Sequence, residues 1–224
     1  MWWNPLVNVH AFLESLASRW DDFPNSETPR DQRFTELIEA VPGLTRPNNL
    51  ALLNHAASQL PSGEMYVEVG SLRGTSLIAA MLDNDEKTFV AIDDFSRPEA
   101  TRAELERNLK RFGCEQAKIL EGDAFEILRV GDPLLKGQPA GVYYYDAAHT
   151  YEQQYEGLKL AESYLADRAL LIVDDSDWDF VAQATEDYLR DQRQAELVLE
   201  LPGKEAGRPD WWLGVQVLSW KRTA

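Results

Sequence analysis

The stretch VEVGSLRGTS, residues 67–76, sets the class of fold, because one sequence pattern ends in it and another begins. The run EMYVEVG, residues 64–70, is typical of a short buried strand and ends in glycine. The run TSLIAAMLD, residues 75–83, has a helical pattern. Gly70 and Gly74 allow the connecting backbone to turn tightly and let a ligand approach its peptide groups. The stretch therefore predicts a strand, a tight loop and a helix.

The same alternation of strand and helix continues toward the C-terminus. It predicts βαβ units and an α/β fold with a doubly wound, mostly parallel sheet. The region before it has only helical patterns, so we predict an N-terminal helical extension at residues 1–60 and a main domain at residues 61–224. The last two apolar runs predict a closing pair of strands. The seven expected strands lie within residues 64–70, 88–94, 117–123, 141–147, 169–175, 195–203 and 211–221.

Composition narrows the classes of function. The formal net charge of −16, with no visible Lys/Arg cluster, argues against a nucleic-acid backbone or an anionic membrane surface as partner. The single cysteine, Cys114, leaves no internal disulfide and no CxxC metal knuckle. The start MWWNPLVNVH has no basic segment followed by an apolar one, so a cytoplasmic enzyme is the expectation.

Acidic residues gather where the expected strands stop. In open parallel sheets the ligand lies outside the carboxyl ends of the strands, at the point where the strand order reverses. Acids are also common at helix N-termini, where they complement the helix dipole. The residues to consider are Glu68–Gly70, Asp93–Asp94, Glu121–Asp123, Asp146 and Asp174–Asp175.

The glycine loop is neither of the common phosphate-binding motifs. Leu72 stands where GxGxxG needs glycine, and GxxxxGK[ST] is absent. The spacing Glu68-x-Gly70-x-x-x-Gly74-x-Ser76 instead resembles the first motif of class I S-adenosylmethionine-dependent methyltransferases. The resemblance implies that the loop, with Ser71, packs against the cofactor and that Glu68 accepts a hydrogen bond from its ammonium group, directly or through water. The alternative is a strand-to-helix turn that only needs glycine.

Two further strand ends fit the same resemblance. Asp93 ends the second strand, where an acid can accept hydrogen bonds from ribose hydroxyls, and Asp94 is the second choice. Asp123, followed by Ala124, ends the third strand, where the resemblance implies a contact with the adenine amino group. Either acid could instead cap a helix. The closing strand pair is consistent with the family, which adds a final antiparallel strand to the sheet.

A second set of acids predicts a cation site. If the fourth and fifth strands are neighbours, about 5 Å apart, Asp146, Asp174 and Asp175 converge at one edge. Three carboxylates so close repel one another unless something neutralises them. Because no thiolate is available and the ligands are oxygen atoms, Mg²⁺ or Mn²⁺ is favoured over structural zinc.

The segments YDAAHTYE, residues 145–152, and LIVDDSDWD, residues 171–179, resemble the metal-dependent macrocin- and mycinamicin-type sugar O-methyltransferases and related small O-methyltransferases. The resemblance implies Asp146, Asp174 and Asp175 as metal ligands and His149 as general base. It also implies methylation of a hydroxyl on a small molecule, a sugar or vicinal diol. His149 could instead cap the following helix, and Ser176 and Asp177 read as helix caps.

Two alternatives remain open at this stage. One is a methyltransferase without a metal, and the other is a non-catalytic cofactor-binding module of the same fold. The N-terminal helices either cover the acceptor site or make a subunit contact, so a homo-oligomer is one expectation. Trp2, Trp3, Trp211 and Trp212 read first as core residues and second as part of an acceptor pocket or oligomer contact.

Overall fold

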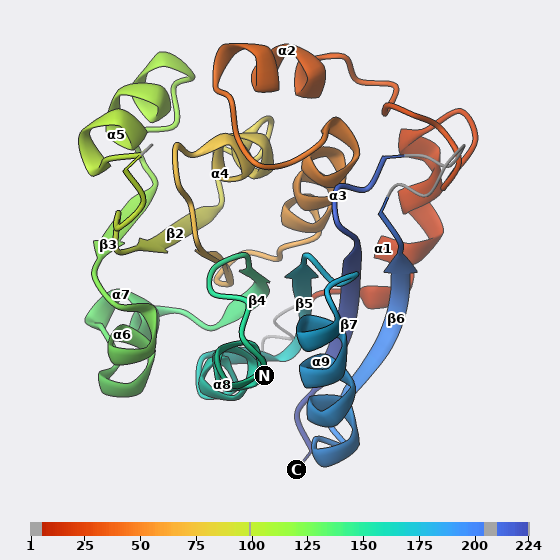
Figure 1. The fold of residues 1–224 in the computed structure, drawn as a ribbon, viewed down its shortest axis with the longest axis vertical. Helices are drawn as coiled ribbons and strands as arrows, with labels where there is room; N and C mark the ends of the chain where they lie inside the picture. Colours follow the sequence, from red (N-terminus) through yellow and green to blue (C-terminus); the bar gives the residue numbers. More distant parts are fainter. Residues whose placement is uncertain (1–5, 99, 204–209, 224) are drawn as a thin grey trace.

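The computed structural model describes residues 6–98, 100–203 and 210–223; Trp2 and Trp3 lie outside the described residues. The strands are β1 (Met65–Val69), β2 (Thr88–Asp93), β3 (Lys118–Glu121), β4 (Ala140–Tyr145), β5 (Leu165–Asp174), β6 (Ala195–Leu201) and β7 (Val215–Lys221). They form one sheet in the order β3-β2-β1-β4-β5-β7-β6 (Figure 1). The strands β1 to β5 pair in parallel, and β7 is antiparallel to β5 and β6. The predicted α/β fold, with its antiparallel last strand, is confirmed.

Helices cover both faces of this sheet (Figure 1). They are α1 (Val9–Leu16), the 3-10 turn η1 (Ala17–Arg19), α2 (Arg33–Ala40), α3 (Pro47–Ser58), α4 (Thr75–Met81), α5 (Arg102–Arg111), α6 (Ala124–Val130), α7 (Pro133–Gly137), α8 (Tyr151–Ala161) and α9 (Asp179–Asp191). Residues of α1 to α5 share a hydrophobic cluster with one face of the sheet, and residues of α6 to α9 share a second cluster with the other face. In the described part of the chain, no helix has both the length and the apolar character of a membrane span.

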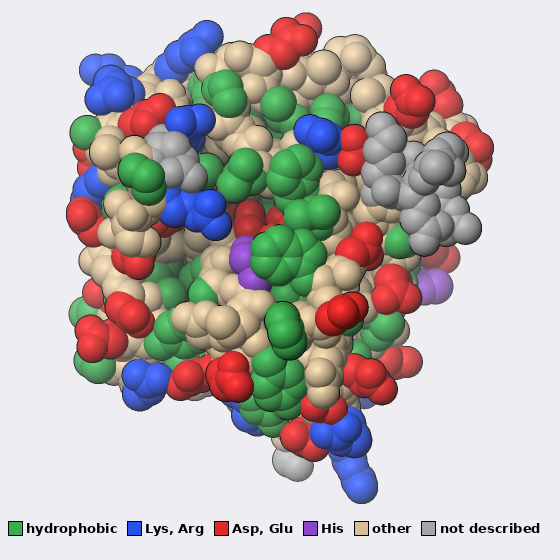
Figure 2. Space-filling view, viewed as in Figure 1, with side chains coloured by type: hydrophobic (Ala, Val, Ile, Leu, Met, Phe, Trp, Pro, Cys, Tyr) green, Lys and Arg blue, Asp and Glu red, His purple; other side chains and the backbone are tan. Residues whose placement is uncertain are grey.

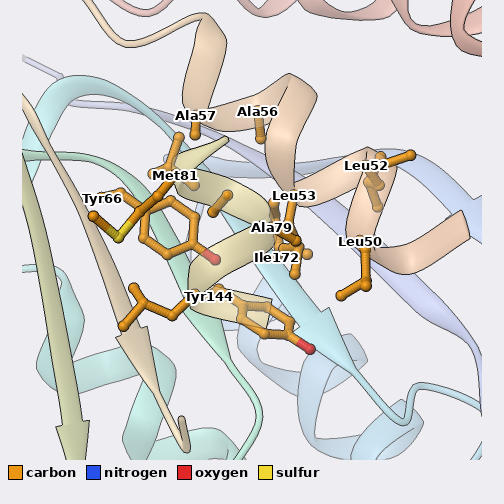
Figure 3. Packing of buried hydrophobic residues seen from close by; sticks show 14 of the residues in the cluster. Leu50, Leu52, Leu53, Ala56, Ala57, Tyr66, Ala79, Met81, Tyr144 and Ile172 are labelled. Carbon is orange, nitrogen blue, oxygen red and sulfur yellow. The ribbon is translucent and has the colours of Figure 1, made fainter. Parts of the chain in front are cut away.

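The N-terminal helices pack as part of the first helical layer. All residues of α3 from Asn48 to Ala57 are buried, because the helix lies inside this layer. Figure 3 shows Leu53 and Ala56 of α3 close to Ala79 of α4 and to the sheet residue Ile172. The helices α1, α2 and α3 thus contribute to the same hydrophobic core as the sheet. The predicted division of the chain into two parts at residue 60 stays a prediction.

The loops after β1 and β4 touch at the point where the strand order reverses. β1 has β2 on one side and β4 on the other. Gly70, directly after β1, has a φ of +92°, and a Cβ atom built on it would lie 1.7 Å from the carbonyl oxygen of Asp146. The two loops can approach this closely only because residue 70 has no side chain.

We expect Gly70→Ala to destabilise the chain by about 3 kcal/mol or more, because the left-handed backbone and the steric clash add. Gly113→Ala is a matched control: Gly113 also has a positive φ, of +71°, but nothing lies within 4 Å of its Cβ position. The control should cost only about 1–2 kcal/mol. Urea unfolding of both variants measures the difference, and equal losses would contradict the proposed close contact.

A buried acid lies at the opposite end of the sheet. Glu64 precedes β1 and is 4% exposed, and its Oε2 has no hydrogen-bond partner among the described residues. Burial, with a smaller effect of the charge on Asp167, raises the pKa of Glu64 to about 7 from 4.5. The folded chain therefore retains a proton that the unfolded chain releases between these pH values. This contribution to stability is present below pH 4.5 and is lost as the pH rises through 7.

We therefore expect Glu64→Gln to change the pH dependence of folding. At pH 8 the variant should be more stable than the natural chain by about 1–3 kcal/mol, because no charge has to be buried. At pH 4.5 the advantage should disappear. Urea unfolding at the two pH values measures the free energies, and a difference independent of pH would show that Glu64 is not protonated in the folded chain.

Candidate active site

A cavity of about 570 Å³ opens at the carboxyl ends of the parallel strands. This size lies within the range of small-molecule and cofactor sites. Figure 2 shows a hollow on one face of the molecule in which a histidine and acidic side chains lie beside hydrophobic ones. The lining comes from the loops at residues 69–72, 92–97, 122–125 and 146–149, from Thr75, Ser76, Ala100, Gln153, Asp175 and Trp178, and from residues 43–45 and 212–213.

The glycine loop brings only part of its predicted residues to the cavity. Gly70, Ser71 and Ser76 line it, whereas Glu68 and Gly74 do not. Glu68 lies fully buried behind the loop and accepts hydrogen bonds from Ser76 Oγ at 2.8 Å and Tyr66 OH at 3.0 Å. Glu68 thus supports Ser76 from behind the cavity wall, while its expected hydrogen bond with a ligand, directly or through water, stays a prediction.

Glu68 and Gly74 both lie in the packed interior behind the cavity wall. Burial raises the pKa of Glu68 to about 7, although its hydrogen bonds act in the opposite direction. Gly74 begins α4 with a φ of +89°, and a Cβ atom there would lie 2.4 Å from Leu105 Cδ1. Gly74 is therefore needed for the packing of α4 against α5 and not for the wall of the cavity.

Asp93 joins two loops of the cavity wall. Its Oδ2 accepts a hydrogen bond from Leu72 N at 2.8 Å, and its Oδ1 accepts one from Phe95 N at 2.7 Å. Each carboxylate oxygen keeps a second lone pair for a ligand hydroxyl. The neighbouring Asp94 accepts from Ser96 N at 2.9 Å and so closes a local turn. The two acids therefore have different surroundings although both line the cavity.

Asp123 has the capping role that was left open above. It is the N-cap of α6, and its Oδ1 accepts from Glu126 N at 2.9 Å. Asp123 and Ala124 also line the cavity, so the cap does not exclude a ligand contact. For His149 the capping alternative is wrong, because Thr150 is the N-cap of α8 and accepts from Gln153 N.

Backbone strain is concentrated at the cavity. In the described part of the chain, five residues other than glycine have a positive φ, and four of them line the cavity. Strained backbone costs about 1–3 kcal/mol per residue and is typical of ligand sites. The four residues are Leu72, Phe95, Asp175 and Trp212.

The structure brings together Asp146, His149 and Asp175. One potential ligand atom from each of them lies within 4.8 Å of the others. His149 Nε2 lies 3.2 Å from Asp175 Oδ2, and the imidazole edge faces Trp178 with ring centroids 5.1 Å apart. Tyr144 OH donates to Asp146 Oδ2 at 3.2 Å.

Burial dominates the electrostatics of this cluster. It raises the pKa of Asp146 well above its usual range, and the negative charges of Asp174 and Asp175 add to the shift. Burial also lowers the pKa of His149, although Asp175 acts in the opposite direction. The charge of Arg97, which also lines the cavity, lowers the pKa of both His149 and Asp175, so it favours the neutral imidazole and the ionised Asp175 carboxylate.

Asp174 departs from the predicted ligand set. Adjacent β4 and β5 carry the acids to one edge, as expected, but consecutive strand residues point to opposite faces. Asp174 is 1% exposed and does not line the cavity; its Oδ1 accepts from Asn49 Nδ2 at 3.3 Å. Burial, and then the charge of Asp175, raises the pKa of Asp174 to about 8. Asp175, with its φ of +53°, turns into the cavity beside His149.

The predicted helix caps after β5 are also corrected. The N-cap residue of α9 is Trp178, which makes no side-chain capping bond. Asp177 instead accepts from Gly203 N at 2.7 Å, and its own N–H donates to Leu213 O at 2.8 Å. Asp177 therefore anchors the connection between β6 and β7 beside the cavity.

Residues just before α3 and just before β7 contact one another beside the cavity. Arg46, at the start of α3, pairs with Asp210 at 2.7 Å, and its guanidinium lies 4.9 Å from the ring centroid of Trp212. Trp211 packs against Trp20 with ring centroids 5.4 Å apart. Trp212 thus belongs to the cavity wall, as the second interpretation of the tryptophans held, while the buried Trp211 belongs to the core.

The chain is similar in sequence to known methyltransferases. Residues 67–176 match the family model of a methyltransferase domain. The chain is 34% identical over 98 residues to a protein from Methanosarcina acetivorans named as a cobalt-precorrin-6B C(15)-methyltransferase (decarboxylating). That match covers 44% of this chain and 51% of the relative, so the chain spans about half the length of the curated relatives it matches.

Solved structures share the fold. The O-methyltransferase TomG from Streptomyces achromogenes, in complex with S-adenosylmethionine, superposes with a TM-score of 0.64 at 16% identity, over 94% of this chain and 95% of that chain. An O-methyltransferase from Bacillus cereus, in complex with S-adenosylhomocysteine, gives 0.59 at 13% identity, over 95% and 97% of the two chains. At such identities the likeness establishes the fold alone.

We expect Asp93→Asn to weaken binding of S-adenosylhomocysteine about tenfold or more, which corresponds to about 1.4 kcal/mol. An asparagine keeps one acceptor oxygen, so it cannot hold Leu72 N and Phe95 N together. Asp94→Asn is the matched control and should leave the affinity unchanged. Isothermal titration measures both variants; the reverse result would assign the ribose contact to Asp94.

Proposed function

We propose that this chain is a class I S-adenosylmethionine-dependent methyltransferase, which the match of residues 67–176 to a methyltransferase domain supports, and that it methylates a hydroxyl oxygen of a small molecule with the help of a divalent cation. The observation that carries the proposal is the cluster of Asp146, His149 and Asp175 at the wall of the cavity. It unites two carboxylates with raised pKa values and a neutral imidazole.

The surroundings of the cofactor are proposed from the cavity lining. Gly70, Ser71 and Ser76 would face its amino-acid part, and Asp93 its ribose. Asp123 and Ala124 would lie beside the adenine. Glu68 and Gly74 would act indirectly, the first through Ser76 and the second through the packing of α4.

The donor set fits a hard divalent cation such as Mg²⁺ or Mn²⁺. Asp175 Oδ1 is buried without a hydrogen-bond partner among the described residues, and Asp146 lies in the same cluster. These two carboxylates would hold the ion, and Asp174 would support them from behind the cavity. Carboxylate oxygens are the ligands that these ions prefer.

The residues of the chain then have separate tasks. When bound, S-adenosylmethionine supplies an electrophilic methyl group, and the cation makes the acceptor hydroxyl more acidic. The imidazole of His149 would take the hydroxyl proton while the O–CH₃ bond forms and the S–CH₃ bond breaks. Asp175 Oδ2, 3.2 Å from His149 Nε2, would stabilise the imidazolium that results.

The acceptor is proposed to carry neighbouring hydroxyls, as in a sugar or another vicinal diol. Two such oxygens can bind one ion together, which fixes the nucleophile in position. Trp178 and Trp212 line the same cavity as the acid cluster and would offer apolar contacts to such an acceptor. A partner of this kind is a small molecule, and a homo-oligomer remains compatible with the proposal.

A competing activity is methylation at carbon. The curated relatives that match at 34–35% identity are named as decarboxylating C(15)-methyltransferases. The acid cluster favours oxygen, because a cation and a base are what a hydroxyl needs to become nucleophilic. Activity that survives EDTA and leaves a new C–CH₃ group would support the competing activity.

We expect EDTA to abolish methyl transfer to a vicinal diol and Mg²⁺ or Mn²⁺ to restore it. His149→Gln should lower kcat by about 10²–10⁴-fold, because the general base is lost, with S-adenosylhomocysteine affinity unchanged. His10→Gln, at an exposed position of α1, is the control and should behave as the natural chain. Full turnover by the His149 variant would rule out its role as base.

A further inference from the structure

Asn49 links the N-terminal helices to the acid cluster. It lies on α3, outside residues 67–176, and is 2% exposed. Its Nδ2 donates to Asp174 Oδ1 at 3.3 Å, and Asp174 is itself 1% exposed. The contact spans 125 residues of sequence and joins the first helical layer to the end of β5.

Asn49 differs from the other buried polar residues of α3. Asn54 uses its amide to hold the carbonyls of Ala79 and Leu82, at 2.9 and 2.7 Å, and so joins α3 to α4. His55 Nε2 lies 3.1 Å from Phe12 O. These contacts tie helices to one another. Asn49 alone in this set has a carboxylate of the strand-end pair as its partner.

Unpartnered oxygen atoms surround this contact. Asn49 Oδ1, Asp174 Oδ2 and Asp175 Oδ1 are buried and have no hydrogen-bond partner among the described residues. A buried acceptor without a partner costs about 1–3 kcal/mol. Three such atoms on residues joined by one hydrogen bond and one peptide bond are unusual in a folded chain and leave acceptor capacity for a positively charged ligand.

We infer that Asn49 is a positioning residue of the cation site: its amide fixes the side chain of Asp174 and thereby the strand end from which Asp175 turns into the cavity. The inference rests on the proposed function. Asp175 adopts a left-handed backbone, and such a turn persists only where the surroundings hold it. Groups that orient metal ligands from behind typically change metal affinity 10–100-fold when they are replaced.

The test is Mn²⁺ binding to the full chain, followed by electron paramagnetic resonance, with S-adenosylhomocysteine affinity measured in parallel. Asn49→Leu keeps the branching of the side chain at Cγ and removes its donor. We expect Mn²⁺ affinity to fall 10–100-fold while S-adenosylhomocysteine affinity stays within twofold. Asn49→Ser, whose hydroxyl is too short for the same contact, provides the same test if the leucine variant does not fold.

Asn54→Leu is the matched control, because it removes a buried amide from the same helix at a site remote from the acids. It should lower the melting temperature and leave Mn²⁺ affinity unchanged. Wild-type Mn²⁺ affinity in both Asn49 variants would overturn the inference and leave the proposed function intact. A natural chain that binds no Mn²⁺ would overturn the proposed function and this inference together.

Discussion

The fold and the site both depend on the contact between the backbone of Gly70 and the carbonyl of Asp146. It is the point where the loops after β1 and β4 meet, and no side chain fits between them. On one side of this contact lies the glycine loop with Ser71 and Ser76, and on the other lies the cluster of Asp146, His149 and Asp175. A methyl donor on one side and an acceptor on the other would be held at bonding distance by this one approach of two backbones.

The acids in and behind the cavity wall lower the stability of the folded chain when no ligand is bound. Glu68, Asp146 and Asp174 all have pKa values raised first by burial, and the latter two repel neighbouring carboxylates as well. Tyr66, Tyr144 and Asn49 each donate one hydrogen bond to this set, which reduces the cost without removing it. A chain selected for stability alone would replace such residues with apolar ones. Their presence is therefore an argument for a functional role of this edge of the sheet.

The sequence predicted the sheet and its ligand edge because both follow from local patterns. Alternating apolar runs mark the strands, and an acid at the end of a run needs no knowledge of tertiary contacts. The sequence could not tell which of Asp174 and Asp175 enters the cavity. The directions of the two side chains depend on the left-handed backbone at Asp175, which the residue type does not predict. The hydroxyl of Tyr144 could have been found, since Tyr144 and Asp146 are two residues apart and share a face. Asn49 could not, because it reaches the site through helix packing, and Trp212 was only a second interpretation, because its place depends on a distant strand pair.

Trp212 lines the cavity, and Arg46 contacts both its ring and Asp210 beside it. None of these residues belongs to residues 67–176, the segment that carries the family pattern. Substitutions in these two outlying segments would reshape this border of the cavity while leaving the residues of the central segment in place.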